Sequence, residues 1–151
     1  MIGEIVPSSF RDPSGFLFTR DGVLFRQVNQ AYRENYDKLM SSGLYDALVG
    51  RGILIPHEEV SLDLLDGAGF EIPPHQGDAY KVIRPERAPF ISYPYEWCFS
   101  QLKDAATLTL EIQKRALAHD LWLKDSSAYN IQFHRGKPIL IDTLSFEIYP
   151  E

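Results

Sequence analysis

Two apolar runs separated by a two-residue turn give the clearest pattern in the first part of the chain. The runs cover residues 15–20 and 23–28, and Asp21-Gly22 stands between them. Asp-Gly between aromatic and β-branched runs is the strongest short-range signal for a β-hairpin. We therefore predict an antiparallel hairpin here, preceded by an irregular lead-in at residues 1–14.

Two later segments have the spacing of amphipathic helices. Apolar residues recur at intervals of three and four across residues 29–49, and again across a longer segment from Ser100 to His119. Ser41-Ser42-Gly43 can split the first segment into two helices, because a glycine inside a helix costs roughly 1 kcal/mol relative to alanine. The second segment predicts one long helix.

Between these helices the sequence predicts short strands and one long loop. Ile53–Pro56 is a strand candidate that stops at its proline, and residues 61–78 are rich in glycine, proline and acidic residues, which predicts a mobile loop. Two further strands are predicted at 79–84 and 89–97. Aromatic side chains in the second of them either stack on a nucleotide base or pack in the core; they are Tyr93, Tyr95 and Trp97.

The C-terminal part predicts a polar loop followed by a hairpin. The loop runs from Lys124 to Asn130, and the strands at 131–133 and 138–141 end on Asp142. A hairpin returns the chain to its starting point, so Asp142 is expected close to Asp125 and Asn130. The predicted fold class is therefore α+β: a small antiparallel sheet with a helix, then a long helix and a C-terminal β-hairpin.

These three oxygen-bearing side chains have two interpretations. Two carboxylates and an amide oxygen are ligands that Mg²⁺ takes from proteins when phosphate and water complete its shell. Alternatively, Asp125 can form an Asx turn, Asn130 can tolerate a left-handed backbone, and Asp142 can cap the turn after its strand. The residue types alone leave both interpretations open.

Composition and charge exclude several classes of function. The chain has 151 residues and a net charge of −6, which disfavours a general nucleic-acid surface. Its one cysteine, Cys98, allows no disulfide within the chain and favours a cytoplasmic location. No apolar run approaches the roughly 20 residues of a membrane span, and the N-terminus does not resemble a secretion signal. The four histidines lack the spacing of zinc ligands.

The order Asp125, Asn130 and Asp142 resembles the catalytic loop and metal-binding aspartate of protein kinases and aminoglycoside-type phosphotransferases. This resemblance implies that Asp125 accepts the proton of a substrate hydroxyl, while Asn130 and Asp142 hold Mg²⁺ with ATP. It also implies nucleotide contacts from Arg26, in the place of the usual strand lysine, and from Lys81.

The chain departs from that pattern in several places. Leu123 stands where those families carry histidine, and Thr143-Leu144 replaces the Phe-Gly of protein kinases. A glycine-rich phosphate loop is missing, and the chain given has too few residues after Asp142 for a complete second lobe. The implied fold is therefore a truncated protein-kinase-like fold.

A second resemblance is more specific. The amino-acid sequence of residues 124–133 and 141–147 is similar to part of a segment found in bacterial class I S-adenosylmethionine (SAM)-dependent methyltransferases, including nodulation-type ones. In those proteins the segment precedes the methyltransferase domain. It covers the chain from about Pro13 onward. It implies that residues 1–151 are a single kinase-like N-terminal domain of a longer protein, with SAM bound by the absent domain.

Two functions follow from these resemblances. The first is a pseudokinase-like accessory domain without catalysis of its own, whose partners are the missing C-terminal methyltransferase domain and a small-molecule or glycan substrate. The second is a small phosphotransferase that uses Mg²⁺ and ATP. The chain lacks the strand, glycine-rich turn and helix of a SAM site, so any methyl transfer belongs to the absent domain.

Overall fold

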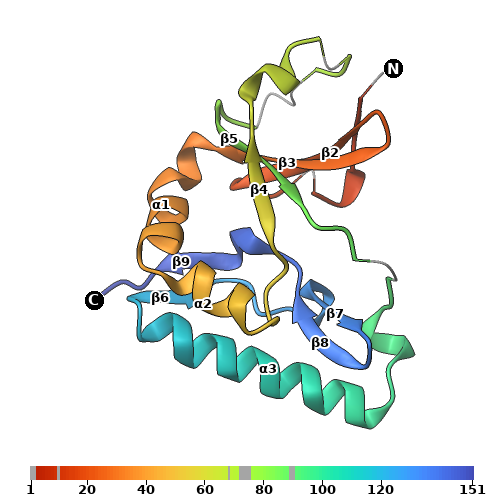
Figure 1. Ribbon diagram of the computed structural model, residues 1–151, viewed down its shortest axis with the longest axis vertical. Coiled ribbons are helices and arrows are strands. Elements are labelled where there is room, and N and C mark those ends of the chain that lie inside the picture. Colours follow the sequence, from red (N-terminus) through yellow and green to blue (C-terminus); the bar gives the residue numbers. More distant parts are fainter. Residues whose placement is uncertain (1–2, 10, 68, 72–75, 89–90) are drawn as a thin grey trace. The chain divides into compact units, whose positions relative to one another are not determined.

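The computed structural model describes residues 3–9, 11–67, 69–71, 76–88 and 91–151, and the chain divides into two compact units. Unit 1 comprises Met1–Glu34 and Pro56–Arg87, and unit 2 comprises Asn35–Ile55 and Ala88–Glu151. Within them lie an antiparallel sheet, helices and a C-terminal hairpin (Figure 1). The predicted α+β class is confirmed, whereas a single domain over residues 1–151 stays a prediction.

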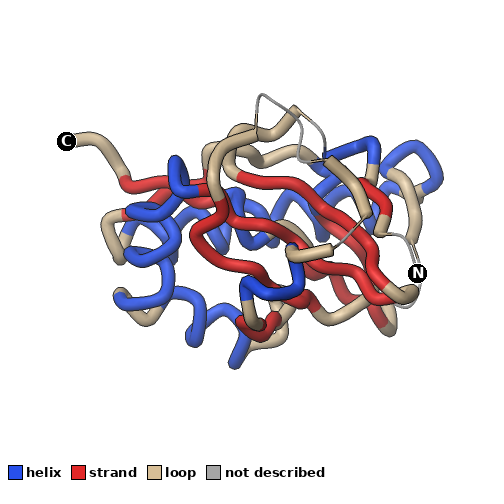
Figure 2. The backbone as a smooth tube through the Cα atoms, turned by 90° about the horizontal axis from the view of Figure 1, so that it is seen from above, coloured by secondary structure: helices blue, strands red, loops and turns tan. Residues whose placement is uncertain are grey.

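Unit 1 is built on one five-stranded sheet in which every neighbouring pair is antiparallel, in the order β1-β2-β3-β5-β4. The strands, red in Figure 2, are β1 (Glu4–Ile5), β2 (Gly15–Arg20), β3 (Val23–Asn29), β4 (His57–Val60) and β5 (Ala79–Pro85).

The predicted N-terminal hairpin is confirmed as β2 and β3. Asp21 and Gly22 both have positive φ angles, 53° and 77°, as a tight turn matching the strand twist requires. Phe18 lies opposite Phe25, and their stacked rings, 5.6 Å apart, form the core of this unit with Phe16 and Val82. The lead-in at residues 1–14 is not wholly irregular, because Glu4–Ile5 pairs with β2.

Strand β4 was not predicted, because its sequence His-Glu-Glu-Val offers two residues that are depleted in strands. It is an edge strand, and its pairing with β5 is reinforced by ion pairs. Glu58 pairs with Arg84, which lies directly opposite, and Glu59 pairs with Lys81 at 2.9 Å. The sequence of β4 has no alternation of apolar and polar residues that could fix its pairing with β5. The opposite charges across the two strands favour this pairing instead.

The predicted mobile loop at 61–78 contains a short 3-10 helix, Leu62–Leu65, which is capped by the Ser61 hydroxyl, the acceptor of the Asp63 N–H at 3.2 Å. Residues 68 and 72–75 of this loop lie outside the described residues. Gln76, near its end, is buried and accepts a 2.7 Å hydrogen bond from the Asn29 side chain. The mobility of the loop stays a prediction.

Unit 2 contains most of the helical structure and three pairs of extended segments. Helix α1 starts in the last residues of unit 1 and continues into unit 2. The elements are α1 (Arg33–Ser41), α2 (Leu44–Gly50), α3 (Phe99–Leu117), β6 (Leu121–Leu123), β7 (Ile131–His134), β8 (Lys137–Leu140) and β9 (Phe146–Ile148).

Two sequence predictions about unit 2 are confirmed, and a third is not. The first helical segment breaks where the serine-glycine run predicted, because Gly43 adopts a left-handed conformation with φ 84° between α1 and α2. The C-terminal hairpin is β7 and β8. The strand predicted at Ile53–Pro56 does not form: only Leu54 makes an isolated parallel bridge, to Leu140, with backbone hydrogen bonds of 2.9 and 3.0 Å on either side.

Two further predictions about unit 2 need correction. Residues 89–97 were predicted as a strand, but Pro94–Glu96 is a 3-10 turn in which the Glu96 carboxylate accepts from the Tyr93 N–H at 2.7 Å; Pro89 and Phe90 lie outside the described residues. Proline at the first helical position favours such a turn. Helix α3 begins before Ser100, because Gln101 accepts from the Cys98 N–H and caps the helix there.

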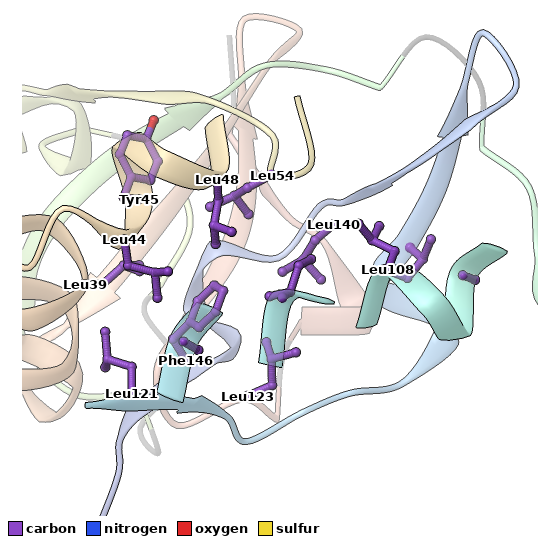
Figure 3. Packing of buried hydrophobic residues seen from close by; sticks show 14 of the residues in the cluster. Leu39, Leu44, Tyr45, Leu48, Leu54, Leu108, Leu121, Leu123, Leu140 and Phe146 are labelled. Carbon is purple, nitrogen blue, oxygen red and sulfur yellow. The ribbon is translucent and has the colours of Figure 1, made fainter. Parts of the chain in front are cut away.

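The core of unit 2 joins α2, α3 and the short strands. Phe146 lies at 0% exposure within this cluster (Figure 3). Strand β9 was not predicted; it pairs with β6, with Phe146 opposite Leu123. Trp97 packs edge-on against Phe133 at 5.0 Å, so of its two interpretations the core role is the correct one.

No helix in the described part of the chain combines the length and the apolar character that crossing a bilayer requires.

We predict that Phe146→Ala destabilises the 151-residue chain by about 3–5 kcal/mol, because it removes a fully buried ring and leaves a cavity. Urea denaturation followed by circular dichroism measures the change. The matched control is Phe99→Ala, which removes an 81% exposed ring and should change stability by less than about 0.5 kcal/mol. Equal effects of the two substitutions would contradict the position assigned to Phe146.

A second prediction concerns His57, at the start of β4. Burial lowers the pKa of this imidazole from 6.5 to about 4, and the nearby Glu59 carboxylate partly offsets the shift. Because the folded pKa is the lower one, the unfolded chain binds more protons between these values, so this contribution to stability is complete above pH 6.5 and is lost as pH falls toward 4.

After allowance for solvent screening, we expect a loss of about 1 kcal/mol from this residue between about pH 7.5 and about pH 5.5. Urea denaturation at the two pH values measures it. His57→Gln should remove this part of the pH dependence, whereas substitution of the exposed His134 by Gln should leave it in place. An unchanged pH dependence in His57→Gln would refute the prediction.

Candidate functional site

The loop between β6 and β7 is held by its own side chains. Asp125 accepts a 2.9 Å hydrogen bond from the Ser127 N–H through Oδ1, which is an Asx turn. Ser127 in turn caps the 3-10 helix Ala128–Asn130 by accepting from the Tyr129 N–H at 3.3 Å. The sequence Asp-Ser-Ser therefore gives this loop a defined backbone, with the Asp125 side chain exposed.

Asn130 and Asp142 lie at the two ends of the β7–β8 hairpin. The Asn130 carbonyl accepts a 2.9 Å hydrogen bond from the N–H of Ile141, the residue before Asp142. Asp142 then caps the short 3-10 turn Thr143–Ser145, because its Oδ1 accepts from the Leu144 N–H at 3.0 Å. The hairpin thus returns the chain to Asn130, as the sequence predicted.

Ser145 links Lys124, Asn130 and Asp142 and was not identified from the sequence. It is fully buried, and its N–H donates to the Asp142 carbonyl at 3.3 Å. Its hydroxyl accepts from the Asn130 carboxamide at 3.5 Å, and its carbonyl accepts from the Lys124 N–H at 2.8 Å. The residue before Asp125, the residue Asn130 and the residue Asp142 therefore all bond to the same serine.

The turn roles of Asp125 and Asp142 are observed directly, whereas Asn130 does not have the left-handed backbone that the turn interpretation allowed, because it is the last residue of the 3-10 helix Ala128–Asn130. Oδ1 of Asp125 and Oδ1 of Asp142 each accept a backbone N–H in a tight turn. The Asn130 carboxamide uses its nitrogen toward Ser145, which leaves its oxygen as the atom that a hard cation would take. Within the described ranges, no group of three or more His, Cys, Asp and Glu residues could hold a metal.

The two predicted nucleotide contacts lie in unit 1, on β3 and β5. The register pairs Arg26 with Ile83 and Lys81 with Val28, so both cations lie on the same face of the sheet. Arg26 is buried and forms a 2.7 Å ion pair with Asp12. Lys81 pairs with Glu59 on β4. Each cation is thus engaged by a carboxylate of its own sheet unit.

Unit 1 also contains a cavity of about 530 Å³ that the sequence did not indicate. It lies beside the β2–β3 turn and the facing ends of β4 and β5. His57, Arg84 and Arg87 contribute polar groups, and Val23 and Pro56 are among its apolar residues. No local motif marks it, because its walls come from three segments that only the strand pairing brings together.

One known protein is similar over almost the whole chain. The nodulation protein NoeA of Rhizobium meliloti (strain 1021) is 34% identical over 146 residues, which is 95% of this chain. The chain spans 28% of the length of that curated relative. No protein-family model and no solved structure matches the chain. The predicted resemblance to a nodulation-type protein is therefore confirmed, whereas the methyltransferase and kinase-like characters stay predictions.

Proposed function

We propose that this chain is an accessory domain of a longer nodulation-type protein in the cytoplasm, a SAM-dependent methyltransferase, and that it recognises substrate or packs against the catalytic domain. The observation that carries the proposal is the extent of the similarity. It covers 95% of this chain but 28% of the relative, as expected for one domain of a larger protein.

The contacts at the candidate site support a role without catalysis. The carboxylates of Asp125 and Asp142 close turns, and the cations of Arg26 and Lys81 pair with carboxylates. Each of these residues has a role in the fold that accounts for its presence. SAM would be held by the absent domain, where it supplies the methyl group, and this chain would contribute binding and orientation.

A kinase-like origin is part of the proposal, and the order of elements supports it. An antiparallel sheet comes first, with α1 and α2 inserted between β3 and β4. The long helix α3 then leads through β6 into the loop that carries Asp125, and the β7–β8 hairpin follows. Descent of this kind is compatible with lost activity, because function depends on the site and not on the fold.

We expect the natural protein that carries this segment to bind SAM, with an affinity that Asp125→Asn changes by less than about twofold, because Asp125 serves only its loop. Isothermal titration calorimetry with SAM measures both affinities. A natural reading frame that stops at Glu151, or a longer protein that binds no SAM, would contradict the proposed function.

We also expect Mg²⁺-ATP to give no binding heat with the 151-residue chain at millimolar concentration, because Arg26 and Lys81 are already paired. Calorimetry is the measurement, with Asp142→Ala and, as a control at an exposed position, Asp63→Ala. Heat that disappears in the Asp142 variant and persists in the control would instead establish the phosphotransferase alternative.

The turn role of Asp142 can be separated from a metal role by the choice of substitution. Asp142→Ala should destabilise the chain by about 1 kcal/mol, whereas Asp142→Asn should cost only a few tenths, because asparagine also caps. Urea denaturation without added metal gives both values. A loss of equal size in the two variants would show that the carboxylate charge matters beyond the cap.

A further inference from the structure

Helix α3 has apolar residues on more than the face that packs in unit 2. Its buried stripe is Ala105, Leu108, Ile112 and Ala116. A second stripe remains exposed and consists of Phe99, Leu102, Ala106, Leu110 and Leu117. At about 100° per residue the two stripes adjoin and together cover about 200° of the helix. A helix with one solvent face normally shows a narrower apolar arc.

The exposure of the second stripe is substantial. Phe99 is 81% exposed and Leu110 is 71% exposed. The charged residues of α3 are on the remaining arc, where Arg115 and Glu111 form an ion pair at 3.1 Å. Gln113 lies within the second stripe, where its side-chain oxygen accepts the Leu123 N–H at 2.7 Å. Side chains at Asp104 and Lys103 also lie on this arc and are exposed. The helix therefore has a distinct water-facing side, and the Phe99–Leu110 side is not part of it.

Part of the second stripe is hollowed. A groove of about 380 Å³, which we call the α3 groove, is lined by Trp97, Leu102, Ala105, Ala106, Thr109, Leu110, Ser126 and Ala128. It forms because small side chains at 105, 106 and 109 lie between the larger Leu102 and Leu110. Its other wall is the loop that follows Asp125. None of the lining residues is charged, so the groove suits an apolar occupant.

We propose that the α3 groove is an intramolecular docking site, covered by a polypeptide segment of the same longer protein that inserts two or three apolar side chains. This inference rests on the proposed function, since it requires polypeptide beyond residues 1–151. It names a surface for the contact between this domain and the rest of the protein.

Two observations favour this occupant. The relative that matches 95% of this chain has most of its length outside the match, so such a protein has ample polypeptide to cover the face. The stripe is continuous from Phe99 to Leu110, about three turns of helix, and so extends beyond the hollow between Leu102 and Leu110; Gln113 separates it from Leu117. Burial of the exposed leucine and phenylalanine side chains would stabilise the association, because it removes apolar surface from water.

Cysteine labelling in the intact natural protein tests the proposal. Leu110→Cys and Ala106→Cys are made in a Cys98→Ser background, and Asp104→Cys on the polar arc is the control. Iodoacetamide labelling is followed by peptide mass mapping. All three positions are exposed in this chain taken by itself, so a covered groove should slow labelling at positions 110 and 106 by at least about tenfold relative to position 104.

Equal labelling rates at the three positions would overturn the proposal. Protection that disappears on dilution would also overturn it, because the occupant would then be a second copy of the protein. Protection that is independent of concentration supports it. SAM binding by the same preparations is measured separately, so a protein that protects Leu110→Cys but binds no SAM contradicts the proposed function and leaves the docking site standing.

Discussion

The hydrogen bonds to Ser145 hold together the loop after β6 and the two ends of the β7–β8 hairpin. Lys124, Asn130 and Asp142, which belong to three neighbouring segments of the chain, bond to this one buried residue. A buried serine needs partners for its hydroxyl and backbone groups, and these segments supply them. Ser145 also lies beside Phe146, which anchors β9 in the apolar cluster. The turn Thr143–Ser145 and the apolar cluster around Phe146 are therefore held in place together, because Ser145 and Phe146 are adjacent in the chain.

This dependence explains why the candidate catalytic residues have structural roles. A carboxylate beside a turn can accept backbone N–H groups that would otherwise lack partners, and both Asp125 and Asp142 do so. In an active phosphotransferase the same side chains would need to meet a hydroxyl and a cation. A domain retained for recognition can keep these residues because its backbone depends on them, and chemistry is not required to explain them.

In the sheet of unit 1, charged side chains also have a structural role. Its inner part is specified by aromatic packing between Phe18 and Phe25, whereas its edge is specified by pairs between acidic residues of β4 and cations of β5. Exposed ion pairs contribute little stability individually, about 0–1 kcal/mol. Their effect here is on register, because Glu58 and Arg84 face each other directly. The Lys81 ammonium thus has a partner within the sheet.

Local sequence determined the elements whose signal is contained in a few adjacent residues. The Asp21-Gly22 hairpin, the break at Gly43, the long helix α3 and the β7–β8 hairpin follow from turn chemistry and apolar periodicity. The α+β class and the return of Asp142 toward Asn130 follow from these elements. The mistaken strand at 89–97 shows the limit, since its aromatic residues match a strand but Pro94 and Glu96 form a capped turn.

Tertiary structure alone decided the features that join distant segments. β4 is a strand because β5 lies beside it, since His-Glu-Glu-Val has weak strand propensity, and β9 has only three residues, too few to be recognised without its pairing to β6. The central place of Ser145 depends on three segments meeting at one residue, which no spacing encodes. The apolar residues of both α3 stripes can be recognised from the sequence. Which stripe is buried depends on the segments that pack against the helix, so only the tertiary structure shows it.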